Sequence, residues 1–214
     1  MLLAAAITGP QSSPPPAPNA QAAPLEQAIA HYGTVESYRV TIRSSHAGSS
    51  GEHIVYYYLK PGFVRMEFIS PHSGALLIYS PRTRLVRLWP FGYGHFPELH
   101  FNPENPLILA SGGQHVDRSD VGVLFGDMHA LQESGGTKVL GEEAMDGRTV
   151  LHLLTTGADD FTVTGVHQYE MWLDSASQFP VKVISRNIHG AVVETVTMDE
   201  LQVNPGLPET MFDP

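Results

Sequence analysis

The side chains best suited to chemistry in this 214-residue chain are its eleven histidines, which could ligate a metal ion or carry protons. No two of them have the spacing of the helical zinc motifs His-x-x-x-His or His-Glu-x-x-His. His95 and His100, with Glu98 between them, form the best candidate pair. Because ligand spacing is the usual signature of a metal site, scattered surface histidines are the favoured interpretation, and we predict no metal site.

Other patterns associated with catalysis are missing as well. The sequence has no Gly-x-Ser-x-Gly elbow and no glycine-rich loop that ends in Lys-Ser or Lys-Thr, and it contains no cysteine. The acidic pairs Glu142-Glu143 and Asp159-Asp160 are adjacent in sequence, and adjacent residues of a strand point to opposite faces. We therefore predict a protein that is not an enzyme and uses no cofactor, with a His-dependent hydrolase as the least favoured hypothesis.

The composition limits the class of partner. Charged residues make up 16% of the chain, the formal net charge is −10, and lysine and arginine form no cluster. Nucleic acid is therefore excluded as a partner, and adsorption to an anionic membrane surface is disfavoured. No run of about 18 apolar residues encodes a transmembrane helix.

The first 23 residues indicate export. Residues 1–7 (MLLAAAI) are typical of the apolar part of a signal peptide, and Ala20-Gln21-Ala22 fits a small-x-small cleavage site. The basic region that normally precedes such a segment is absent, so we expect the start codon to lie further upstream. The alternative is a disordered proline- and alanine-rich tail. In both cases residues 1–23 contribute no fold, and residues 24–214 are expected to form one domain.

Residues 52–89 predict four short strands separated by turns that contain proline and glycine. The expected strands are 53–59, 63–69, 76–79 and 84–89. In the second strand apolar and charged side chains alternate, Val64, Met66 and Phe68 against Arg65 and Glu67. This period of two predicts a strand with one buried face. The triplet Tyr56-Tyr57-Tyr58 should likewise divide between the two faces.

The flanking sequence predicts further strands and two helices. One helix is expected over residues 24–33, and a second over 120–132 with Ser119 or Asp117 as its cap. Residues 46–51 are expected to form a flexible hairpin loop. The additional strands are expected at 38–44, 138–142, 149–155, 166–174, 181–187 and 191–203.

Residues 90–110 interrupt the strand pattern. Four prolines and several aromatic residues occupy 90–106, an apolar stretch follows at 107–110, and the second helix then carries Gly122 and Gly126. Long loops in compact domains are usually functional or mobile, and glycine weakens a helix. A movable cover and an ordinary packed helix both remain open as interpretations.

The order of the elements predicts a mostly β (α+β) fold. Because the helices do not alternate with the strands, the sheet should be antiparallel. A sheet of about ten or eleven strands tends to curl, so we expect a curved, incomplete antiparallel β-barrel with helices covering its open side. Its apolar interior would suit an apolar ligand.

The ordered series of turns resembles the LolA/LolB superfamily of outer-membrane lipoprotein carriers. The resemblance spans residues 25–214. It is carried by Lys60-Pro61-Gly62-Phe63-Val64-Arg65, Ser70-Pro71, Tyr79-Ser80-Pro81, Trp172-Leu173-Asp174, Phe179-Pro180 and Asn204-Pro205-Gly206-Leu207-Pro208.

The resemblance implies a non-catalytic periplasmic carrier that shields acyl chains of lipids or lipoproteins in a hydrophobic cavity. A membrane donor complex and an outer-membrane acceptor would be its partners, and a monomer is expected. A lipid- or lipoprotein-sensing regulatory module of the same fold is the alternative. The family's lid maps near residues 105–109, and Lys60 stands where carriers have a basic latch residue. The predicted cavity or lid side chains are Tyr56, Tyr58, Val64, Met66, Phe68, Leu107, Ile108, Leu109, Leu124, Met128 and Met171.

Overall fold

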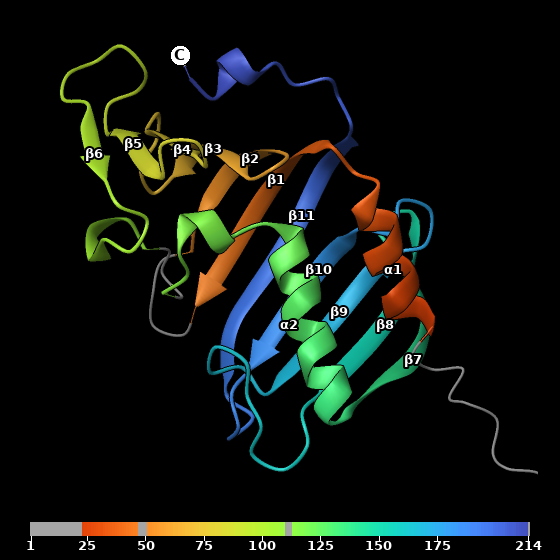
Figure 1. Ribbon diagram of the computed structural model, residues 1–214. Coiled ribbons are helices and arrows are strands. Elements are labelled where there is room, and N and C mark those ends of the chain that lie inside the picture. Colours follow the sequence, from red (N-terminus) through yellow and green to blue (C-terminus); the bar gives the residue numbers. More distant parts are fainter. Residues whose placement is uncertain (1–22, 47–50, 110–112, 214) are drawn as a thin grey trace, which may run out of the picture.

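The computed structural model describes residues 23–46, 51–109 and 113–213, within which eleven strands form a single sheet. Helices α1 (Ala23–Gly33) and α2 (Val121–Ser134) lie on one face of it (Figure 1). The strands are β1 (Ser37–His46), β2 (His53–Leu59), β3 (Phe63–Ser70), β4 (Leu76–Ser80), β5 (Leu85–Trp89), β6 (Leu99–Phe101), β7 (Gly136–Met145), β8 (Arg148–Thr156), β9 (Gln168–Asp174), β10 (Pro180–Arg186) and β11 (Val192–Val203).

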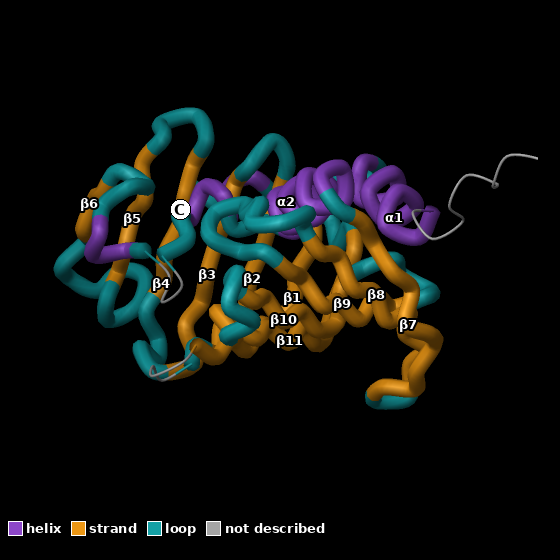
Figure 2. Tube along the Cα trace, turned by 90° about the horizontal axis from the view of Figure 1, so that it is seen from below, coloured by secondary structure: helices purple, strands orange, loops and turns teal. Residues whose placement is uncertain are grey.

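The sheet is built outward from its middle. Its strand order is β6-β5-β4-β3-β2-β1-β11-β10-β9-β8-β7, so the first and last strands of the chain pair at the centre, with Tyr38 opposite Val203. Every neighbouring pair is antiparallel. The sheet curves toward the helices and does not close, because β6 and β7 remain its two edges (Figure 2). The expected incomplete barrel is confirmed.

The alternation predicted for the strands is present in the packing. Val64 of β3 belongs to the main core on the inner face of the sheet, and Met66 and Phe68 pack against that core. Arg65 and Glu67 lie on the outer face, where they contact each other. Tyr56 and Tyr58 also belong to this core, and Tyr57 belongs to a second cluster on the outer face. A one-residue shift of register would exchange these two sets, so the apolar pattern fixes the pairing.

Strand β6 was not predicted, because it lies inside the segment interpreted as a loop. It has three residues and pairs only with β5, with Phe101 opposite Val86. Three residues are too few to show an alternating pattern, so only the pairing with β5 identifies this strand.

The predicted cap of α2 was wrong. Asp120, and neither Ser119 nor Asp117, accepts the hydrogen bond from the Gly122 amide at 2.7 Å. The Ser119 hydroxyl instead donates to the carbonyl of Val116 at 2.7 Å, within a 3-10 turn that directly precedes α2.

Gly122 lets the two helices approach each other. A Cβ atom at this position would lie 2.6 Å from the Tyr32 ring of α1. The glycine that lowers the helix propensity of α2 is therefore the residue that allows α1 to pack against it.

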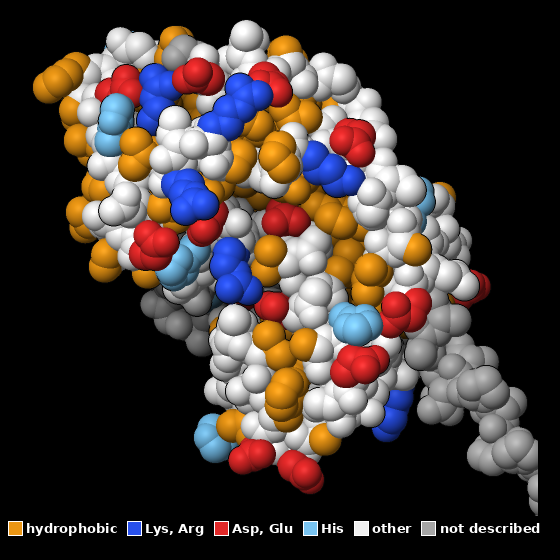
Figure 3. Space-filling model, viewed as in Figure 1, with side chains coloured by type: hydrophobic (Ala, Val, Ile, Leu, Met, Phe, Trp, Pro, Cys, Tyr) orange, Lys and Arg blue, Asp and Glu red, His pale blue; other side chains and the backbone are white. Residues whose placement is uncertain are grey.

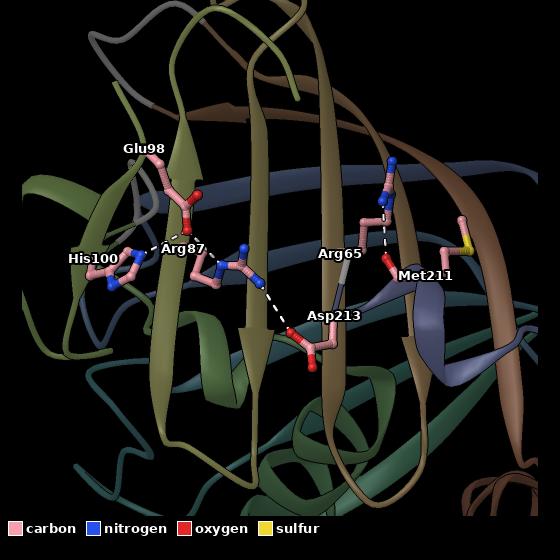
Figure 4. A network of polar contacts seen from close by, with 6 residues as sticks. All are labelled: Arg65, Arg87, Glu98, His100, Met211 and Asp213. Atoms are coloured by element: carbon pink, nitrogen blue, oxygen red, sulfur yellow. Dashed lines mark hydrogen bonds and ion pairs between the residues drawn. The ribbon is translucent and has the colours of Figure 1, made fainter. Parts of the chain in front are cut away.

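The C-terminal segment covers the outer face of β2 to β5. Phe212 packs there in an apolar cluster with Tyr57, Phe63, Leu76, Ile78 and Trp89. Arg65 donates a hydrogen bond to the carbonyl of Met211 at 3.0 Å, and Arg87 contacts Asp213 at 3.1 Å and Glu98 at 2.8 Å (Figure 4). These contacts hold the end of the chain on the sheet beside a short 3-10 helix, η3 (Glu209–Met211).

Two predictions fall outside the described residues. They are the export segment or tail, apart from Ala23, and most of the loop expected between β1 and β2. Within the described part of the chain, no helix is long and apolar enough to cross a membrane.

Candidate ligand cavity

A cavity of about 730 Å³ lies between the inner face of the sheet and its cover. The sheet side comes chiefly from β1, β2, β3 and β11, and the cover comes from the segment between β6 and α2 together with the first half of α2. Viewed from the helix side, hydrophobic side chains are visible in the central part of this face, with charged side chains beside them (Figure 3). The volume falls within the range of pockets that hold small-molecule ligands.

The sheet wall of the cavity is apolar because of the strand period. Every second residue of β1, β2 and β3 points inward, which places aliphatic and aromatic groups side by side. Met66, Phe68 and Leu88 are only partly buried, because one side of each faces the cavity. The apolar wall residues are Tyr38, Val40, Ile42, Ile54, Tyr56, Met66, Phe68, Leu77, Leu88, Val183, Val196 and Met198.

The cover over the cavity is made of short turns. A 3-10 helix, η1 (Pro106–Ile108), contributes Leu107 and Ile108, and a second, η2 (Val116–Arg118), contributes Val116. Ile108 is 7% exposed, whereas Leu107 is 80% exposed although it also borders the cavity. Leu107 therefore stands where the cavity meets the surface.

Three tyrosine hydroxyls fasten the beginning of α2 to the rest of the fold. Tyr32 of α1 donates to Asp120 at 2.9 Å, Tyr38 of β1 accepts from the Val121 amide at 3.1 Å, and Tyr56 of β2 contacts the Ser119 hydroxyl at 3.1 Å. Burial raises the pKa of all three hydroxyls well above the usual range, so they remain neutral hydrogen-bonding groups. The Tyr38 and Tyr56 rings stack with their centroids 5.9 Å apart.

The cavity also has a polar end. Glu194 of β11 accepts a hydrogen bond from Gln114 at 3.2 Å and lies 3.1 Å from Nε2 of His46. Burial raises the pKa of Glu194, and the nearby His46 partly offsets this effect. Burial also raises the pKa of Asp127 of α2, against the opposing effect of the Arg118 guanidinium. A few polar groups in an apolar pocket are the usual means of orienting a ligand.

The predicted latch residue Lys60 contacts the end of α1. Its Nζ donates to the carbonyl of Gly33 at 2.8 Å and lies 3.4 Å from the Glu36 carboxylate. Lys60 thus ties the turn between β2 and β3 to the end of α1. A role in releasing a lid stays a prediction.

The predicted ligand-binding residues fall into two groups. Tyr56, Met66, Phe68, Leu107, Ile108, Leu109 and Leu124 border the cavity. Tyr58, Val64, Met128 and Met171 are buried in the main core away from the cavity wall. Which of these residues contact a ligand stays a prediction.

The polar residues of the cavity were not predicted. Gln114, Asp127 and Glu194 come from a loop, a helix and a strand that are distant in sequence, so no local motif joins them. One signal was present, because Glu194 shares its strand face with Val196 and Met198. An acidic residue on the apolar face of a strand indicates that its carboxylate has a hydrogen-bonding or charged partner in the folded protein.

Two of the described histidines lie in ion pairs or hydrogen bonds with carboxylates. His100 contacts Glu98 at 2.7 Å, and His152 lies between Glu143 at 2.7 Å and Glu170 at 3.0 Å while stacking on Trp172. Across the described ranges, no group of three or more His, Asp or Glu side chains is arranged to hold a metal ion.

Comparisons with known proteins identify the fold. No family model matches the sequence, and no curated protein matches it. Among solved structures, an uncharacterized conserved protein from Thermus thermophilus superposes with a TM-score of 0.54 at 12% identity, over 90% of this chain and 93% of the other. The lipoprotein LppX of Mycobacterium tuberculosis gives 0.50 at 11% identity, over 88% and 97%.

MucB gives a TM-score of 0.53 at 19% identity, and the match covers 91% of this chain but only 62% of MucB. A LolA superfamily protein from Nitrosomonas europaea is also among the matches, at 0.36 and 14% identity over 90% and 96% of the two chains. The fold shared with MucB and LppX agrees with the incomplete antiparallel barrel expected from the turn series. At these identities the likeness concerns the fold.

Proposed function

We propose that this chain is a non-catalytic binding protein that shelters an acyl chain of a lipid or lipoprotein in its cavity. The observation that carries the proposal is the cavity of about 730 Å³, with an apolar sheet wall and a cover of short turns. Burial of apolar surface would supply the binding free energy, about 0.8 kcal/mol for each methylene group.

The proposal includes export and transfer. The apolar segment 1–7 and the small-x-small site at residues 20–22 support an exported, periplasmic protein. Solved relatives of the fold include the lipoprotein LppX. A carrier would receive its cargo from a membrane donor and pass it to an outer-membrane acceptor. Leu107 and Ile108 would then form the part of the cover that moves.

A regulatory module that senses a lipid or lipoprotein is the second candidate. It is supported by the structure of MucB in complex with MucA(peri), which shares the fold at a TM-score of 0.53 and 18% identity over 89% of this chain and 58% of the other. Both candidates bind a ligand in the cavity. They differ in whether a partner protein binds according to whether the cavity is occupied.

The test measures occupancy of the cavity directly. We expect native mass spectrometry of the protein purified without detergent to show a bound lipid. After delipidation, the uncharged fluorescent probe N-phenyl-1-naphthylamine should bind with a saturating signal. A protein that carries no lipid and binds no probe would contradict the proposal.

A pair of tryptophan variants locates the binding. Val196 borders the cavity, and Thr195 precedes it on the opposite face of β11. Val196→Trp fills the cavity and should abolish probe binding. Thr195→Trp adds the same side chain outside the cavity and should leave probe binding unchanged. Equal binding by the two variants would place the probe elsewhere.

A further inference from the structure

We propose that the polar end of the cavity selects an amphiphile whose head group is an ammonium, and rejects amphiphiles with anionic head groups. This inference rests on the proposed function and specifies its ligand class. The residues that carry it are Glu194, Asp127, Tyr169 and Gln114, contributed by β11, α2, β9 and the loop before η2.

The charges that border the cavity are mostly negative. Four carboxylates line it, those of Glu52, Asp120, Asp127 and Glu194, against the single guanidinium of Arg118. Asp120 caps α2 by accepting a hydrogen bond from the Gly122 amide. The positive charge of Arg118 lowers the pKa of Asp127 and so partly offsets the effect of burial. No lysine of the described residues borders the cavity. A carboxylate or phosphate head group would therefore meet repulsion at close range, in a site of low dielectric constant.

The polar groups converge from different elements. Burial raises the pKa of the Tyr169 hydroxyl, and the nearby charges of Asp127 and Glu194 raise it further. Tyr169 is 6% exposed and Glu194 is 9% exposed, so both groups are largely removed from solvent. Hydrogen-bond acceptors dominate this end of the cavity, and they require a donor.

The surroundings of Glu194 contain an unpartnered polar atom. The His46 side chain, 3.1 Å from Glu194, is 7% exposed, and its Nδ1 has no hydrogen-bond partner among the described residues. Buried polar atoms of a folded protein are normally paired. Within the described residues, Nδ1 of His46 is thus an unpartnered polar atom beside the Glu194 carboxylate that borders the cavity.

The geometry fits a single-chain amphiphile in one orientation. The apolar wall of β2 and β3 would receive the tail, and the polar end near Glu194 would receive the head group. The ammonium group supplies three donors and a positive charge, which matches two carboxylates and a tyrosine oxygen. A carboxylate head group of the same size offers only acceptors.

The experiment compares head groups on one tail. Dodecylamine, which is an ammonium ion at pH 7, and dodecanoate are used below their micellar concentrations to displace N-phenyl-1-naphthylamine from the delipidated protein. We expect dodecylamine to compete at a concentration lower by about tenfold or more, which corresponds to about 1.4 kcal/mol. Equal potency, or stronger competition by dodecanoate, would overturn the inference and leave the proposed function standing. Absence of probe binding would overturn both.

Three variants test which residues cause the preference for an ammonium head group. Glu194→Gln and Asp127→Asn each remove one negative charge at similar volume, and each should reduce the preference for dodecylamine to about threefold or less. Asp146→Asn removes one charge in the exposed turn between β7 and β8 and should leave the preference unchanged. Because the Glu194 and Asp127 variants are independent, failure of one to fold leaves the other as the test. A preference that persists in both would overturn the assignment.

Discussion

The inner face of the sheet has two regions that both carry apolar side chains and that are filled differently. Under the helices, Leu153, Met171, Met128 and Leu131 are fully buried, and none of them borders the cavity. Over the cavity wall, which comes chiefly from β1, β2, β3 and β11, Met66, Phe68 and Leu88 are only partly buried. We call these regions the packed half and the hollow half.

The difference comes from the cover and not from the sheet. Helix α2 contacts β7 and β8, and its apolar side chains fill the space above them. The hollow half is covered by η1 and η2, which have three residues each, together with the first half of α2. A single turn presents too few side chains to fill a wide concave surface at the packing density of a protein interior. A cavity therefore remains where short turns replace much of the helical cover.

Two methionine variants test this comparison with the largest expected effect. Met171→Ala in the packed half should lower the free energy of unfolding by about 2–5 kcal/mol, because it opens an enclosed void. Met66→Ala in the hollow half should cost about 1 kcal/mol, because its side chain already borders empty space. Denaturant unfolding measures both values.

The Met66 variant should affect probe binding more than the Met171 variant does. Met66→Ala removes part of the cavity wall and should weaken binding of N-phenyl-1-naphthylamine by about threefold, since part of the apolar contact is lost. Met171→Ala should leave binding unchanged. Similar stability losses in the two variants would contradict the distinction between the halves.

The boundary between the turns and the helix of the cover lies at Asp120, which itself borders the cavity. Asp120→Ala removes the cap of Gly122 and the acceptor of the Tyr32 hydroxyl, so we expect a loss of about 1–2 kcal/mol in the free energy of unfolding. Hydrogen exchange of the Gly122 amide should also accelerate. Asp120→Asn keeps an acceptor oxygen and serves as the control. If both variants unfold alike, the acceptor oxygen is not what fixes the boundary.

Most of the fold could be predicted from the sequence because its strands follow a strict period of two and its turns carry proline and glycine. The division of the inner face into a packed half and a hollow half could not be predicted from the sequence. Met66 and Met171 have the same residue type in the same strand pattern, and only the cover above each decides whether it is enclosed. The polar end was missed for a related reason, since Glu194 and Asp127 meet only after β11 and α2 have packed.

The smallest expected effect on stability concerns the rim of the hollow half. Leu107 is 80% exposed, so Leu107→Asp should change the free energy of unfolding by no more than about 0.5 kcal/mol. The carboxylate would stand where the cavity meets the surface, and we expect several-fold weaker binding of N-phenyl-1-naphthylamine in a fluorescence titration. Ile108→Asp, at a buried position of the same turn, should weaken binding and also destabilise the fold.

An exposed leucine outside the cavity provides the control for this rim. Leu140 of β7 is 51% exposed and does not border the cavity, so Leu140→Asp should leave both stability and probe binding unchanged. A loss of binding in this variant would mean that negative charge on the surface, and not the position of Leu107, lowers affinity. Unchanged binding in both Leu107→Asp and Ile108→Asp would show that η1 is no part of the cover. The hollow half would then open to solvent by another route.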